Sequence, residues 1–139
     1  MTPTDDDIIQ FAAEQLGLMD QAVYPHVEHY SNQWWFWETL EIKILARPST
    51  WKPPFDPLTS WEWLWKGLKS WLDQRGLFEI VAGNSLPKRK FPAEIALWNF
   101  QGRKASEGFI AVAQLPRAFW LCWWRLVQAE DESHLKSEP

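Results

Sequence analysis

The chain is poor in the residues that bring covalent or cofactor chemistry. Its 139 residues include one cysteine, Cys122, so no internal disulfide can form, and this usage fits a reducing compartment such as the cytoplasm. Its six glycines form no P-loop, no dinucleotide-binding turn and no nucleophile elbow. These absences leave no pattern that predicts a catalytic residue, a cofactor or a bound metal.

The chain also lacks a long apolar run and an excess of positive charge. Its longest apolar stretch, Ala118–Trp124, is far below the roughly 20 residues of a membrane-spanning helix. The acidic segment Met1–Asp7 does not resemble a secretory signal. The net charge is −4, whereas a protein that wraps duplex nucleic acid usually carries a basic stripe. We therefore expect neither a membrane nor a duplex nucleic acid as a partner.

Aromatic residues are what the chain has in abundance: 12 Trp, 8 Phe and 2 Tyr. Each ring can bury roughly 150–250 Å², so these side chains alone could form most of a core. Twelve indoles are difficult to bury in a small protein, because each N–H needs a hydrogen-bond partner. We expect a single domain over residues 1–130 with some tryptophans at a surface, followed by a polar, frayed tail over residues 131–139.

Periodicity and capping residues predict an α+β fold, with about three helices packed on a mainly antiparallel sheet of three to four strands. Thr4 is predicted to cap the first helix, and Gly17 to end it. Thr59 and Glu62 predict a capping box at the second helix, which ends at Gly76. The predicted helices span Asp5–Leu16, residues 61–75, and Pro116 to about Glu130. The predicted strands span Trp34–Leu45, Leu77–Ala82, Phe91–Phe100 and Phe109–Ala113. One predicted loop follows Gly17 and runs through Pro25 and Asn32, and another spans Gln101–Gly108.

The predicted strands each have one apolar face and one mixed face. In the third strand, for example, Ile95 and Leu97 point away from Trp98. Helices on one side of the sheet would leave the mixed face partly open. That face would carry an aromatic patch, a candidate ligand-binding surface, made of Trp35, Trp37, Trp98 and Phe100. Alternatively, the last helix covers this face, and the fold is a three-layer rather than a two-layer sandwich.

The last predicted helix is apolar on almost every side. A helix of this kind is either central in the core or pressed against another chain. We expect a homo-oligomer, with an interface formed by the rings of Phe119, Trp120, Trp123 and Trp124. Cys122 on the same helix is interpreted as a small core residue rather than a nucleophile.

Two basic clusters flank the third predicted strand. Lys88, Arg89 and Lys90 precede it, and Arg103 and Lys104 follow it. Arg and Lys bind phosphate, and tryptophan faces stack on nucleobases at roughly 1–3 kcal/mol per base. The clusters therefore predict the phosphate contacts of a small nucleotide, and the alternative is that they are solvated loop charges.

A histidine pair is the one further candidate for a functional site, in this case a metal site. His26 and His29 lie three residues apart with Glu28 between them. Two histidines without a third ligand at a recognisable spacing are a weak metal signal. We interpret the segment as a polar loop and predict no metal site.

Three short motifs carry a family resemblance. Phe55-Asp56-Pro57 before a helix, Leu115-Pro116-Arg117-Ala118 at the start of the last helix, and Leu16-Gly17 at the end of the first resemble small accessory proteins of tailed phages and prophages, the NinX-like and phage α/β-sandwich groups. The segment Trp34–Trp37 departs from that pattern. The resemblance implies an accessory protein acting in the cytoplasm of a bacterial host, and it brings no assigned catalytic residues.

Together these patterns predict a non-enzymatic binder, with a role in counter-defence, that sequesters a small nucleotide-like ligand. The first alternative is an interaction module whose tryptophan-rich surface inhibits or recruits a host protein. An enzyme acting on small phosphorylated or amide substrates is a third class, and aromatics that mark only an oligomer interface are a fourth. The sequence does not decide among them.

Overall fold

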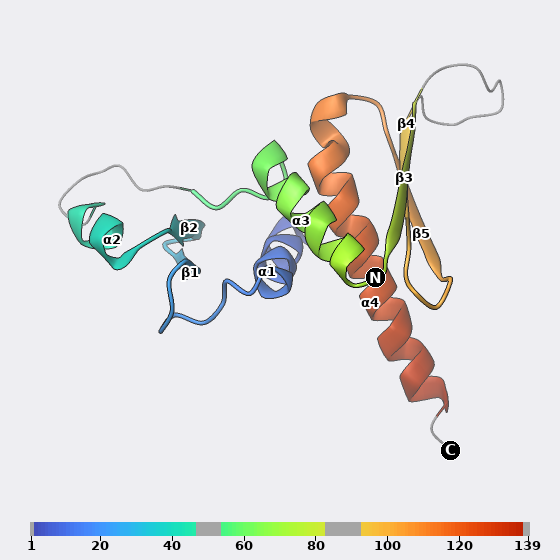
Figure 1. The fold of residues 1–139 in the computed structure, drawn as a ribbon, viewed down its shortest axis with the longest axis horizontal. Helices are drawn as coiled ribbons and strands as arrows, with labels where there is room; N and C mark the ends of the chain where they lie inside the picture. The colour runs from blue at the N-terminus through green and yellow to red at the C-terminus, as the bar shows by residue number, and fades with distance from the viewer. Residues whose placement is uncertain (1, 47–53, 83–92, 138–139) are drawn as a thin grey trace. The chain divides into compact units, whose positions relative to one another are not determined.

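A computed structural model describes residues 2–46, 54–82 and 93–137 (Figure 1). Its contacts group into two compact units, residues 1–56 and residues 57–139, which are described separately below. The described residues of the first unit form α1 (Asp5–Gln15), β1 (His26–Tyr30), β2 (Gln33–Trp37) and α2 (Leu40–Ala46). Those of the second form α3 (Trp61–Asp73), β3 (Leu77–Ala82), β4 (Ala93–Trp98), β5 (Lys104–Phe109), a 3₁₀ turn (Val112–Gln114) and α4 (Leu115–Ser137). The α+β prediction is confirmed, with antiparallel strands throughout the described sheets.

The ends of α1 follow the predicted signals. The Thr4 hydroxyl accepts a hydrogen bond from the Asp7 backbone N–H, and the Asp7 carboxylate accepts one from the Thr4 N–H. This reciprocal capping box satisfies two N–H groups of the helix end. Gly17 takes a positive φ of 71°, a conformation that glycine adopts without steric strain and that stops the helix.

The next segment differs from its prediction. Instead of a loop and one long strand, the chain forms the hairpin β1–β2 and then the short helix α2. Ser31 and Asn32 both take positive φ values, 56° and 61°, as a tight two-residue hairpin turn requires. After β2, the Thr39 hydroxyl accepts a hydrogen bond from the Ile42 N–H, which favours a helix over an extended chain. These local signals outweigh the alternation of apolar residues on which the strand prediction rested.

The second unit contains a three-stranded sheet in the order β3-β4-β5. Leu77 pairs with Trp98, and Trp98 in turn pairs with Lys104. The prediction of a loop at Gln101–Gly108 was wrong, because most of that segment is β5. The predicted fourth strand at Phe109–Ala113 was also wrong, because Phe109 ends β5 and the 3₁₀ turn begins at Val112. The polar sequence of β5 concealed it: Glu107 lies on the helix-covered face, where Arg125 of α4 pairs with its carboxylate.

One face of this sheet is covered and the other is open within the unit. In Figure 1, α3 and α4 lie on the same side of β3–β5. Ile95 and Leu97 are fully buried on that side, and the Cys122 thiol of α4 lies 4.0 Å from the Ile95 carbonyl oxygen. The last helix therefore covers the apolar face, not the mixed face, and the three-layer alternative is wrong for the described residues of this unit. Trp98 lies on the mixed face, as predicted.

The helices differ from prediction in their ends. The Ser60 hydroxyl, not Thr59, caps α3 by accepting from the Trp63 N–H. The last helix continues to Ser137 rather than ending near Glu130. None of the described helices is both long and apolar enough to cross a membrane.

The aromatic face of α4 packs inside the chain. Phe119, Trp120 and Trp123 are at most 2% exposed. The Trp123 ring lies 5.1 Å from that of Trp71 on α3, and Gly67 of α3 fits against the rings of Phe119 and Trp120. The assignment of these three rings to an oligomer interface is therefore corrected: they are core residues of the chain. Trp124, the fourth predicted interface residue, is half-buried, and a homo-oligomer stays a prediction.

Candidate ligand-binding cleft

The four predicted aromatic ligand residues do not share one sheet face. Trp35 and Trp37 lie on β2 of the two-stranded sheet, whereas Trp98 ends β4 of the three-stranded sheet and Phe100 follows it. Trp37 is 5% exposed, and its indole N–H donates to the Glu28 carboxylate. The single aromatic patch predicted from the sequence is therefore wrong, and Trp37 has no exposed ring face to offer a ligand.

Trp98 and Phe100 instead line an open cleft of about 880 Å³ at one end of the three-stranded sheet. Ligand sites commonly have volumes of roughly 300–1,000 Å³ and combine apolar walls with a few polar groups. The lining residues are Arg75, Leu77, Phe78, Glu79, Trp98, Asn99, Phe100 and Gly102. Leu77 and Phe100 are 64% and 69% exposed, so two large apolar side chains stand open to a ligand.

The turn that carries Phe100 is held rigidly. The Asn99 side-chain oxygen accepts hydrogen bonds from the N–H groups of Gln101 and Arg103, at 3.0 and 2.9 Å. Gly102 takes a positive φ of 83°, which closes the turn back onto β5. The Phe100 ring is therefore presented on a turn that hydrogen bonds already hold, so that binding a ligand requires little further loss of backbone entropy.

Trp98 stands between two neighbours on the open face of the sheet. The strand register places Leu77 on one flank of Trp98 and Lys104 on the other. The Lys104 ammonium lies 5.3 Å from the centroid of the indole ring, a cation–π contact. Because Leu77 lines the cleft and Lys104 does not, Lys104 supports the ring from the flank away from the cleft.

Among the described residues that line the cleft, Arg75 carries the positive charge, and its backbone is strained. It follows α3 with a φ of +65°, a position that most chains fill with glycine. The glycine of this chain falls one residue later, because a Cβ at Gly76 would lie 2.4 Å from the Trp71 ring. A left-handed conformation costs a non-glycine residue roughly 1–2 kcal/mol, and such strain concentrates at functional sites.

Of the basic residues predicted to bind phosphate, the two that the structure describes, Arg103 and Lys104, do not line this cleft. The Arg103 guanidinium donates to the Ala129 carbonyl oxygen of α4 at 3.2 Å. Lys104 supports Trp98, and Lys88, Arg89 and Lys90 lie outside the described residues. The sequence prediction missed Arg75 and Glu79. The predicted strand Leu77–Ala82 contains Glu79, and the predicted second helix ends at Arg75. Knowledge of the strand register would have placed both residues near Trp98.

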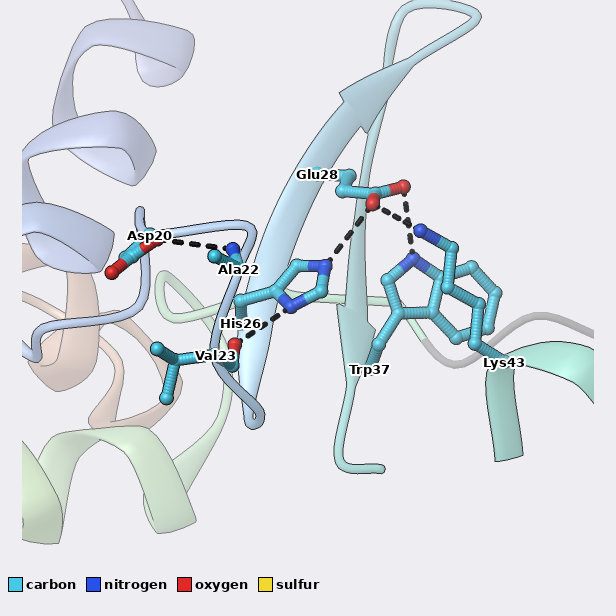
Figure 2. Close-up of polar contacts among 7 residues, drawn as sticks. All are labelled: Asp20, Ala22, Val23, His26, Glu28, Trp37 and Lys43. Carbon is cyan, nitrogen blue, oxygen red and sulfur yellow. Dashed lines mark hydrogen bonds and ion pairs between the residues drawn. The ribbon is translucent and has the colours of Figure 1, made fainter. Parts of the chain in front are cut away.

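A second polar cluster lies in the first unit (Figure 2). The Glu28 carboxylate accepts hydrogen bonds from Lys43 of α2, from the Trp37 indole and from His26 Nε2, the last at 3.0 Å. His26 is fully buried, and its Nδ1 faces the Val23 carbonyl oxygen at 2.9 Å. Burial alone would raise the pKa of Glu28, but the hydrogen bonds and charges of Lys43 and His26 outweigh it, so that the pKa lies below its ordinary value.

This cluster joins structural elements rather than forming an open site. Each oxygen of Glu28 already has a donor, and both His26 nitrogens face an acceptor. The histidine pair considered in the sequence does not form, because residues three apart on a strand point to opposite faces and the His29 ring lies against Trp34. In the described parts of the chain, no group of three His, Cys, Asp or Glu side chains could hold a metal ion.

Cys122 behaves as a core residue. Burial raises the pKa of its thiol to about 12, and the side chain is fully enclosed between α4 and β4. A thiol that stays protonated is a poor nucleophile, in agreement with the sequence interpretation.

Comparison with known proteins adds no relative: no family model, no curated protein and no solved structure matches this chain.

Proposed function

We propose that the chain is a binding protein whose cleft holds a small nucleotide-like ligand without transforming it. The observation that carries the proposal is a cleft of ligand size that is lined by the half-buried Trp98 ring, the exposed Phe100 ring and Arg75. A planar base would stack on the aromatic rings, which contributes roughly 1–3 kcal/mol per base, and Arg75 would bind an anionic group.

The proposal keeps the predicted ligand class and changes the residues that bind it. Trp98 and Phe100 remain, Arg75 replaces the predicted basic clusters, and Trp35 and Trp37 are left out. The resemblance to phage accessory proteins extends the proposal to a biological setting. There, the protein would sequester a nucleotide signal in the cytoplasm of a bacterial host, as a counter-defence measure.

The direct test is isothermal titration calorimetry of the full chain against a panel of 5′-mononucleotides and cyclic nucleotides. Trp98→Ala and Phe100→Ala should each weaken binding by about tenfold or more. Trp65→Ala is the matched control, because Trp65 on α3 is 61% exposed but does not line the cleft. Absence of binding heat across the panel would refute the proposal.

A second candidate function rests on α3. Trp61, Trp65 and Leu72 are exposed at helical spacings of four and seven residues, so they form an apolar stripe on the surface of this helix. Such a stripe is typical of a surface that binds another protein, here one of the host. Capture of a specific host protein that Trp65→Ala abolishes and Trp98→Ala preserves would favour this alternative.

A further inference from the structure

The cleft carries a carboxylate as well as a cation, and together the two charges restrict the class of ligand that it can bind. Glu79 and Arg75 both line the cleft and are both exposed. Within the described part of the chain, neither side chain has an ion pair or a hydrogen-bond partner. Two opposite charges that line one cleft without pairing each other are available for different groups of one ligand.

The strand register places Glu79 beside the stacking ring. Leu77 and Glu79 alternate with Phe78, so both lie on the open face, and Glu79 pairs with Ala96, two residues before Trp98. Diagonal neighbours of this kind lie about 7–8 Å apart at the backbone, within reach of long side chains. A base held against Trp98 in the cleft would therefore have one edge within reach of the Glu79 carboxylate.

The polar groups of the ligand would meet the two ends of this arrangement. Ala96 lies between Glu79 and Ser106 in the register and is 6% exposed, so it is covered by its neighbours and does not itself line the cleft. Arg75 precedes β3 by two residues and Phe100 follows β4 by two, so both lie at the end of the sheet next to Trp98. The sugar and phosphate would extend in that direction, toward the guanidinium.

A carboxylate distinguishes the bases by their hydrogen-bonding edges. When ionised it offers two acceptor oxygens and no donor. Guanine presents two adjacent donors, N1–H and its 2-amino group, on its Watson–Crick edge. Adenine and cytosine set an acceptor ring nitrogen beside their amino group, and uracil sets its single donor between two carbonyl oxygens.

On the basis of the proposed function, we infer that the cleft prefers a guanine nucleotide. Trp98 stacks on the base, Glu79 accepts from N1–H and the 2-amino group, and Arg75 binds the phosphate. The inference deepens the proposed function by naming the base and the residue that reads it.

The test compares GMP, IMP, AMP and UMP by isothermal titration calorimetry with the full chain and two variants. The wild type should bind GMP about tenfold more tightly than AMP, because a good bidentate contact contributes ~1–3 kcal/mol of discrimination. IMP, which lacks the 2-amino group, should bind with intermediate affinity. Glu79→Gln should bring the affinity for GMP down to that for AMP, while the affinity for AMP stays within about twofold.

Glu94→Gln is the matched control. Glu94 lies on the same strand face as Trp98 but pairs with Val81 and does not line the cleft, so its variant should keep the guanine preference. Circular dichroism of both variants establishes that they fold. Nucleotides that bind the wild type with equal affinities, or a guanine preference that survives Glu79→Gln, would overturn the inference and leave the proposed function standing. A wild type that binds none of the four would remove the inference together with the proposed function.

Discussion

At the scale of single residues, backbone strain and side-chain chemistry meet at Arg75. Its φ of +65° is the conformation for which glycine is the natural choice, yet the chain places an arginine there. A side chain kept in a strained position is explained if it is needed at the cleft. Stability and binding should then respond in opposite directions when it is replaced.

Arg75→Gly should raise the free energy of unfolding by about 0.5–1 kcal/mol. It removes the strain of the left-handed conformation, and this gain exceeds the loss that comes from the greater conformational entropy of glycine in the unfolded chain. The same variant should weaken nucleotide binding. Arg75→Lys is the control, since it keeps the strain and a positive charge. Urea unfolding and calorimetry measure both effects, and a less stable Arg75→Gly variant would show that the strain argument is wrong.

Glu28 is the second residue whose environment leads to a prediction. Its pKa is lowered in the folded protein, so its contribution to stability is present at neutral pH and is lost as the pH falls through the lowered pKa. Glu28→Gln should reduce the free energy of unfolding by about 1–3 kcal/mol at neutral pH, because Lys43 and His26 lose a charged acceptor. The difference in the free energy of unfolding between this variant and the wild type should disappear at acid pH.

The indole N–H resonance of Trp37 reports on this cluster directly, because it donates to Glu28. Following that resonance through denaturant titrations at neutral and acid pH measures the first unit rather than the whole chain. Glu38→Gln is the control, since Glu38 is exposed and takes no part in the cluster. Equal stabilities of Glu28→Gln and the wild type at neutral pH would contradict the assignment.

At the scale of helices and strands, the close approach of α3 and α4 depends on one glycine. A Cβ at Gly67 would lie 2.6 Å from atoms of both Phe119 and Trp120. These rings are enclosed in the core and cannot move aside easily. The glycine is therefore required by packing and not by backbone conformation.

Gly67→Ala should destabilise the protein by about 1–3 kcal/mol, the usual range for overpacking, although alanine is the better helix former by about 1 kcal/mol. Lys69→Ala, an exposed change on the same helix, should alter stability by less than about 0.5 kcal/mol. Urea unfolding of both variants decides the matter. An unchanged or more stable Gly67→Ala would mean that α3 and α4 are free to separate.

Some helices and strands were predictable from the sequence because their signals are local. α1, α3 and β3 carry their signals locally: Thr4 and Gly17 at the ends of one helix, and Trp71 and Leu72 in the periodicity of another. β5 was missed because its stability depends on a partner distant in the chain, and the β1–β2 hairpin was missed because its turn, Ser31-Asn32, lacks the glycine that usually marks a two-residue hairpin. Glu107 lies on a covered face and is paired there by Arg125 of α4. In the first unit, Glu28 of β1 is likewise paired by Lys43 of α2.

The candidate site was predictable only in part, for the same reason. The sequence could place Trp98 on the mixed face and Phe100 just beyond it, because β4 alternates clearly. Arg75 and Glu79 belong to the cleft only through the pairing of β3 with β4, and a one-residue shift in register would turn Glu79 to the other face. Pairing register cannot be read from either strand alone.

At the scale of the whole molecule, the contacts of the chain separate at residues 56 and 57, whereas the composition predicted a single domain. The cleft lies entirely in the second unit, as do the α3–α4 core and the sheet that positions Trp98. If each unit has its own core, the second should not need the first for folding or for binding.

A fragment of residues 57–139 should therefore fold and bind the same nucleotide as the full chain, with a dissociation constant within about threefold. Dispersed amide resonances and a cooperative urea transition would establish folding, and calorimetry would compare the affinities. The fragment with Trp98→Ala is the control, because it should fold equally well and bind weakly. A fragment that unfolds would instead support the single domain predicted from the composition, because the core of residues 57–139 would then need residues 1–56 to exclude water.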